Sequence, residues 1–316
     1  MLEKKGHSIG IWSALSSALF LGLAPVFGKQ AMLSGFSPFA VVAFRTILAA
    51  LLLLVIVLIF RRPFLYIYPA GFYGCALAGI LNGIGSLFYY LAIQRLSVSV
   101  GQLLYSLYPI FLVIWLIIDH QPPRVLTYIR IFIALVGVAL LTMSFSVKGD
   151  WLGVVFMLIA SILYAIHLPI NQRVLYDVPA PTVTLYTLFA MSAVVIPPYF
   201  IFNKVLLPTG INWNPIFALT IVTFFSRLML FLGVKKLGGM QTALLGLGEL
   251  IVSISISHIW LHDHLSIFQW IGAALLAGSL FLVGFEKIQP ETRRKRGILG
   301  WLQPPEISSE ISMGPQ

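Results

Sequence analysis

"PFAVVAFRTILAALLLLVIVLIF" (Pro38–Phe60) is an apolar run whose one charged residue is Arg45. An α-helix needs about 20 consecutive apolar residues to cross the roughly 30 Å hydrocarbon layer of a bilayer. The run does not alternate between apolar and polar residues with a period of two, as a strand of a membrane β-barrel would. It therefore predicts a transmembrane helix.

The composition of the whole chain indicates the same class of protein. Of its 316 residues, 59% are hydrophobic and 9% are charged, whereas an average soluble domain has about 25% charged residues. A soluble globule of this size needs more polar surface than that, so we expect an integral membrane protein. The single cysteine, Cys75, excludes a disulfide framework and a cysteine metal cluster.

Ten apolar runs of comparable length predict ten transmembrane helices and an all-α integral membrane fold. Their ranges are Ile9–Gly28, Pro38–Phe60, Pro69–Ile93, Val98–Ile118, Val125–Phe145, Trp151–Ile170, Pro181–Phe202, Pro215–Val234, Thr242–Leu261 and Ser266–Phe285. The links between them are short and contain proline, glycine or charged residues.

The predicted helices divide into two halves of five, at residues 1–146 and 150–286, followed by a basic tail at 287–316 that we expect to be disordered. A shift of 141 residues places Leu91–Leu104 on Leu232–Leu245. Because five is an odd number, two similar halves must enter the membrane from opposite sides. Such inverted repeats are typical of secondary transporters, whose substrate site lies near the midplane where the halves meet.

The distribution of lysine and arginine predicts the orientation in the membrane. With the N-terminus in the cytoplasm, fourteen basic residues fall on the inner side and four on the outer side, as the positive-inside rule requires. We therefore expect a multi-pass protein of the bacterial inner membrane with both termini cytoplasmic. This placement accounts for most of the net charge of +10 with the lipid bilayer as partner and without nucleic acid.

Several motifs, in order and spacing, resemble an EamA-type member of the drug/metabolite transporter superfamily. They are "FLGLAPVFGKQ" (Phe20–Gln30), "SPFAVVAFRTILAALLLL" (Ser37–Leu54), "YYLAIQRLSVSVGQLLYSLYPIF" (Tyr89–Phe111), "FLGVKKLGGMQTALLGLGELI" (Phe231–Ile251) and "QWIGAALLAGSLFLVG" (Gln269–Gly284). The resemblance covers residues 9–286. It implies two inverted five-helix repeats around a central cavity, exporting or exchanging small metabolites, amino acids or drugs by alternating access. The chain departs from the family pattern at Leu250, where the family usually has proline.

Glu249 is the one acidic residue deep inside a predicted span. A charge at the centre of a membrane helix costs about 2.5–3.5 kcal/mol on insertion scales, so such residues face the protein interior or a wet cavity. Glu249 could pair structurally with Arg45 or Arg227, or it could carry a proton or contact a cationic group of the substrate. The two arginines could instead snorkel to the headgroups or bind a carboxylate or phosphate in the cavity.

Uncharged polar and aromatic residues give further candidates for a substrate or coupling site. Helical spacings of three or four relate Gln102, Tyr105 and Tyr108, and likewise His167 and Asn171. Asn82 is the further candidate, on a segment whose Gly79 and Gly83 form a small-residue packing face. Each of them taken singly could equally pack in the core, since aromatic stripes at helical spacing are usually packing.

The remaining residues favour transport over catalysis. His258 and His262 are separated by four residues, next to Asp263 and His264, but the other histidines are scattered. We therefore expect no metal, no cofactor and no catalytic residue. The sequence predicts a secondary active transporter that exports or exchanges a small metabolite, with the proton as the candidate coupling ion. A membrane-integral enzyme and a non-transporting membrane scaffold are the alternatives.

Overall fold

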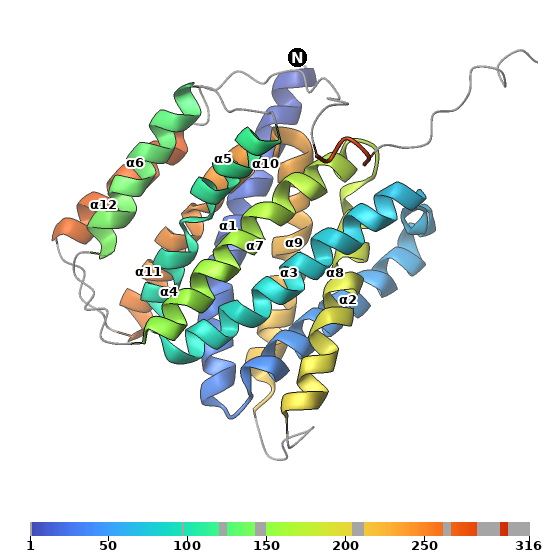
Figure 1. Cartoon of the computed structure of the whole chain (residues 1–316), viewed down its shortest axis with the longest axis horizontal. Helices are drawn as coiled ribbons and strands as arrows, with labels where there is room; N and C mark the ends of the chain where they lie inside the picture. The colour runs from blue at the N-terminus through green and yellow to red at the C-terminus, as the bar shows by residue number, and fades with distance from the viewer. Residues whose placement is uncertain are drawn as a thin grey trace, which may run out of the picture.

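A computed structural model describes residues 2–96, 98–119, 125–142, 150–203, 212–261, 267–282 and 298–302. Within these ranges the chain forms helices and short turns and no strand. Six of the helices are long and apolar enough to cross a membrane. Figure 1 shows them as a bundle, with the N-terminus at one end. The prediction of an all-helical, multi-pass membrane protein is confirmed for this part of the chain.

The long helices correspond to the first, second, third, sixth, seventh and eighth predicted spans. They are α1 (Leu2–Leu33), α2 (Pro38–Phe60), α3 (Pro69–Arg95), α7 (Trp151–Leu175), α8 (Ala180–Phe202) and α9 (Asn214–Leu237). The fifth and tenth predicted spans are the shorter α6 (Val125–Thr142) and α12 (Ile267–Phe281), and a 3-10 turn, η1 (Arg62–Leu65), follows α2.

The fourth and ninth predicted spans are each interrupted, which the sequence analysis did not anticipate. The fourth consists of α4 (Val98–Tyr105) and α5 (Tyr108–Ile118), and the ninth of α10 (Gly239–Gly246) and α11 (Gly248–Leu261). The expectation of ten continuous transmembrane helices is therefore only partly confirmed. The two breaks lie at matching positions of the two halves, because the 141-residue shift places Tyr105 on Gly246.

A proline causes the first break. Pro109 is the second residue of α5, and because proline has no N–H group the carbonyl of Tyr105 loses its helical donor. The hydroxyl of Ser161 in α7 donates to that carbonyl instead, at 2.9 Å. The break is thus satisfied by a neighbouring helix, which is how membrane helices tolerate interruptions.

A tyrosine from the first half stabilises the second break. The N–H group of Leu247 is directed to the carbonyls of Leu244 and Leu245 rather than to that of Ala243. The Tyr108 hydroxyl donates to the Ala243 carbonyl at 2.6 Å. Glycine at position 246 permits this approach, because a Cβ there would lie 2.5 Å from the Tyr108 oxygen.

Helices of one half pack mainly against helices of the other. α1 contacts α9 and α11, α3 contacts α7 and α8, and α6 contacts α12. Figure 1 shows α6 and α12 side by side at one edge of the bundle. This interdigitation creates an interior surface to which both halves contribute, and the polar cavity described next lies on it.

Candidate functional site

A cavity lies between the two halves, and the empty space within it and at its open mouth amounts to about 450 Å³. Its lining side chains come from α1, α2, α3 and α4 of the first half and from α7, α9 and α11 of the second. Six residues singled out in the sequence line it, namely Arg45, Asn82, Gln102, Tyr105, Arg227 and Glu249.

Arg45 enters the cavity from α2 and is only 7% exposed. Its Nη2 donates to the Ser86 hydroxyl at 3.0 Å, and its guanidinium lies over the Tyr90 ring, 4.7 Å from the ring centroid. Its Nε is buried without a hydrogen-bond partner among the described residues. The side chain therefore does not snorkel to the headgroups, which was one of the alternatives.

Arg227 enters from α9 and is 6% exposed. Its Nη2 donates to Asn82 Oδ1 at 3.2 Å, while the Asn82 amide nitrogen is directed to the Met191 sulfur at 3.6 Å. Its Nη1 is buried without a hydrogen-bond partner in the described part of the chain. Arg227, like Arg45, is thus held in the interior by a neutral side chain of α3.

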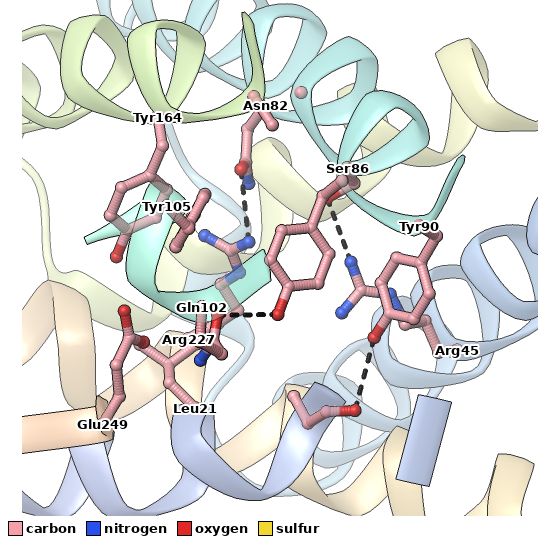
Figure 2. A pocket seen from close by; sticks show the side chains of 14 residues that line it. Leu21, Arg45, Asn82, Ser86, Tyr90, Gln102, Tyr105, Tyr164, Arg227 and Glu249 are labelled. Carbon is pink, nitrogen blue, oxygen red and sulfur yellow. Dashed lines mark hydrogen bonds between the residues drawn. The ribbon is translucent and has the colours of Figure 1, made fainter. Parts of the chain in front are cut away.

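Glu249 lies in the first turn of α11 and is 3% exposed. Because a helix N-terminus carries unpaired N–H groups and partial positive charge, the break before α11 provides a favourable position for a carboxylate. Within the described ranges no salt bridge of 4.0 Å or less joins Glu249 to either arginine. Figure 2 shows Glu249 at one side, Arg45 at the other and the Arg227 guanidinium between them.

Tyrosine rings form much of the remaining wall. Tyr105 contacts Tyr89 and Tyr164, with ring centroids 5.0 and 5.2 Å apart, and Tyr89 contacts Tyr90 at 5.2 Å. The Tyr89 hydroxyl donates to Gln102 Oε1 at 2.8 Å. Sequence reasoning did not select Ser86, Tyr89 or Tyr90. Their spacing of four, seven and eight residues from Asn82 on one helix was the available signal.

Three of the predicted site residues do not line the cavity. Tyr108 is directed to the carbonyl of Ala243. His167 Nδ1 lies 2.6 Å from the Tyr164 carbonyl, and its ring packs on the Tyr164 ring at 4.7 Å. The Asn171 amide donates to the His167 carbonyl at 2.9 Å. These residues support the wall from behind. His262, Asp263 and His264 lie outside the described residues.

A polar cavity to which both halves of a membrane-spanning helical bundle contribute is an arrangement typical of membrane transporters. The model of the EamA-like transporter family matches the chain twice, at residues 8–143 and 151–285, and the chain belongs to this family. It is an EamA-type protein of the drug/metabolite transporter superfamily. The members of the family are transporters rather than enzymes, which favours transport over the membrane-enzyme alternative.

A solved structure, titled "Crystal structure of protein", supports the same fold. It superposes with a TM-score of 0.70, covering 89% of this chain and 96% of its own, at 17% sequence identity. At that identity the similarity concerns the fold alone. No curated protein matches the chain.

Proposed function

We propose that the protein is a secondary active transporter that moves a small metabolite across the bacterial inner membrane by alternating access. The observation that carries the proposal is the group of three ionisable side chains, Arg45, Arg227 and Glu249, around one cavity between the two halves. Ionisable groups at membrane depth are costly, and where they occur they mark substrate and ion pathways.

The cavity residues then take distinct roles in the proposal. Arg45 and Arg227 contact the substrate, and Asn82, Gln102 and Tyr105 position it. Glu249, without a salt-bridge partner among the described residues, binds and releases the coupling proton. Tyr108, His167 and Asn171 hold the surrounding helices in place.

Transport by the purified protein in liposomes tests this proposal. A panel of radiolabelled metabolites is offered with and without a pH gradient, and counterflow exchange is measured in parallel. Glu249→Gln should abolish uptake driven by the gradient and leave exchange intact, because the neutral amide cannot carry a proton. The matched control is Arg62→Gln, since Arg62 is exposed and, among the described residues, its side chain donates to the carbonyl of Leu58 alone.

Two outcomes would contradict the proposal. If no metabolite of the panel moves through the folded protein, the transport function fails, and a scaffold whose Glu249 affects only stability becomes the better explanation. If gradient-driven uptake persists in Glu249→Gln, the proton-binding role of that residue fails while transport itself stands.

A further inference from the structure

We infer that the substrate of the cavity carries a compact anionic group, a carboxylate or a phosphate. This inference rests on the proposed transport function. Two guanidinium groups and one carboxylate line the cavity. The formal charge of the cavity is therefore positive in both protonation states of Glu249. Arginine is always charged and offers a planar fork of donors that matches the oxygens of such anions.

The hydrogen bonds of the two arginines support an acceptor rather than a donor as the missing partner. Arg45 bonds only to Ser86 and Arg227 only to Asn82, and each retains a buried N–H group without a partner in the described residues. A buried unsatisfied donor costs roughly 1–3 kcal/mol, and more when the group is charged. An anion entering between the arginines would satisfy these donors, with its apolar body against the tyrosine rings.

Binding of four matched compounds to the purified protein tests the charge of the ligand. Butyrate, propylphosphonate, butyramide and propylammonium have similar bodies and differ in the head group, and thermal unfolding is followed at equal concentrations. The two anions should stabilise the protein and the other two should not. In Arg45→Gln and Arg227→Gln the anions should bind roughly tenfold more weakly or worse, while Arg62→Gln should bind as the wild type does. The stronger of the two anions identifies the head group.

Equal stabilisation by butyramide, or stabilisation by propylammonium alone, would overturn the anion inference in the wild-type protein itself, whether or not the variants fold. The proposed function fails separately. If anions bind but never cross the membrane, the proposed transport function is wrong and the anion site stands. If counterflow is seen only with a neutral or cationic compound, transport stands and the anion inference is wrong.

A second inference comes from the C-terminal turn, residues 298–302, at the opposite side of the apolar core from the cavity. Leu299 and Leu302 are 4% and 3% exposed, whereas Ile298 and Trp301 are more than half exposed. The two leucines belong to the largest buried apolar cluster, together with residues of α3, α5, α7, α8, α9, α10 and α11. Figure 1 shows the turn, in red, at the end of the bundle that carries the N-terminus.

The turn joins helices from both halves. The backbone N–H of Leu299 donates to Asp119 Oδ1 at 3.4 Å, and the other carboxylate oxygen of Asp119 accepts from Arg173 Nη2 at 3.2 Å in a buried salt bridge. Leu302 packs so closely on α3 that a Cβ at Gly74 would lie 2.8 Å from it. The turn therefore ties α3 and α5 of the first half to α7 of the second.

The order of residues along α3 shows what lies between the C-terminal turn and the cavity. Gly74 touches the turn, Cys75 and Ala78 lie in the apolar cluster, and Ser86 and Tyr89 line the cavity. The cluster thus separates the cavity from this end of the bundle. We propose that the C-terminal turn is a latch that holds this end closed, and that its release permits the α3 and α7 ends to separate. The basic residues predict this end to be cytoplasmic.

Alkylation of Cys75 by N-ethylmaleimide in liposomes tests the latch. Cys75 is the one cysteine of the chain, is fully buried in the apolar cluster and becomes reachable only when that cluster opens. Replacing both leucines, Leu299→Ser with Leu302→Ser, should raise the alkylation rate about tenfold or more, because burial of two leucines no longer favours the closed state. The matched control replaces the exposed residues of the same turn, Ile298→Ser with Trp301→Ser, and should leave the rate unchanged.

An unchanged rate in the leucine variant, or an equal rise in both variants, would overturn the latch. If the leucine variant does not fold, as seen by thermal unfolding, the milder Leu302→Ala decides, with a smaller rise expected. The alkylation rate does not depend on transport, so this test is independent of the proposed function and of the anion inference.

Discussion

Each of the two arginines that line the cavity is held by a neutral acceptor, and both acceptors come from the same helix. Ser86 and Asn82 lie one turn apart on α3, and they accept from Arg45 and Arg227 respectively. A neutral acceptor positions a guanidinium without neutralising it, so the charge stays available to a ligand. By contrast, Arg173, which does not line the cavity, is paired with Asp119 in a buried salt bridge. Among the described residues the two arginines of the cavity have no salt-bridge partner within 4.0 Å, and this distinguishes them from Arg173.

The charged residues of the site could be predicted from the sequence, whereas their partners could not. A charged residue in an apolar run is conspicuous, so Arg45, Arg227 and Glu249 were found from the sequence alone. The pairing of Arg227 with Asn82 joins residues 145 positions apart, and only tertiary packing brings them together. Tyr108 and His167 were selected by helical spacing, which cannot tell a wall from the packing behind it.

The last residue of α3, Arg95, forms an exposed ion pair whose contribution to stability can be tested by varying the pH. Arg95 Nη1 lies 2.9 Å from Asp150 Oδ2, and Asp150 also accepts from the Gly153 N–H as N-cap of α7. The hydrogen bond from Arg95, followed by that from Gly153, lowers the pKa of Asp150. A lowered pKa in the folded state stabilises the protein above the unfolded value of about 3.9, and this contribution disappears as the pH falls through the folded value.

We therefore expect Asp150→Asn to lower the thermal unfolding temperature at about pH 6 and to have a smaller effect at about pH 3, because the contribution of the carboxylate charge declines below the unfolded pKa of about 3.9. The comparison is made in detergent at constant ionic strength, because salt screens an exposed pair. A difference that is the same at both pH values would show that the carboxylate charge contributes nothing.

At the scale of the element, the two interrupted spans differ in cause. Pro109 marks the first break in the sequence, but Leu250 occupies the matching position of the second half, so no proline signals the second break and only the flanking glycines Gly246 and Gly248 do. The hydroxyl of Tyr108 accounts for it by replacing the helical donor to Ala243. The length and apolar character of the spans were therefore predictable, whereas a break that depends on a distant side chain was not.

Gly246→Ala tests this account of the second break. The added Cβ would displace the Tyr108 hydroxyl from the Ala243 carbonyl, and a lost buried hydrogen bond should cost about 1–3 kcal/mol in the free energy of unfolding. Gly278→Ala is the control, because a Cβ there meets nothing within 4 Å and should stabilise its helix by up to about 1 kcal/mol.

A second substitution makes the test specific. In Tyr108→Phe the hydroxyl is absent, so adding Gly246→Ala to it should cost less than in the wild-type protein, by about 1 kcal/mol in a double-mutant cycle. Additive effects of the two substitutions would show that Tyr108 does not stabilise the break.

At the scale of the whole molecule, the two halves are bound together at three places with different chemistry. The cavity collects polar groups from both halves, the apolar cluster collects buried side chains from both, and the C-terminal turn crosses from α3 and α5 to α7. The internal repeat and the family resemblance predicted two halves that meet around a central site. They did not predict the turn, because two leucines in a basic tail carry no signal of the surface on which they pack.

The orientation of the whole bundle in the membrane can be tested with reporter fusions. Fourteen basic residues against four predict that both termini and the C-terminal turn lie in the cytoplasm. A reporter fused after Gln316 should therefore be active only in the cytoplasmic form of the assay, and one inserted after Lys148, between the two halves, only in the external form. Opposite sides at the two positions also follow from an odd number of crossings per half, because the second repeat then begins on the side opposite to the first. If the reporters at both positions lie on the same side, the second half crosses the membrane an even number of times. Two similar halves would then enter from the same side, and the inverted relation between the repeats would be wrong.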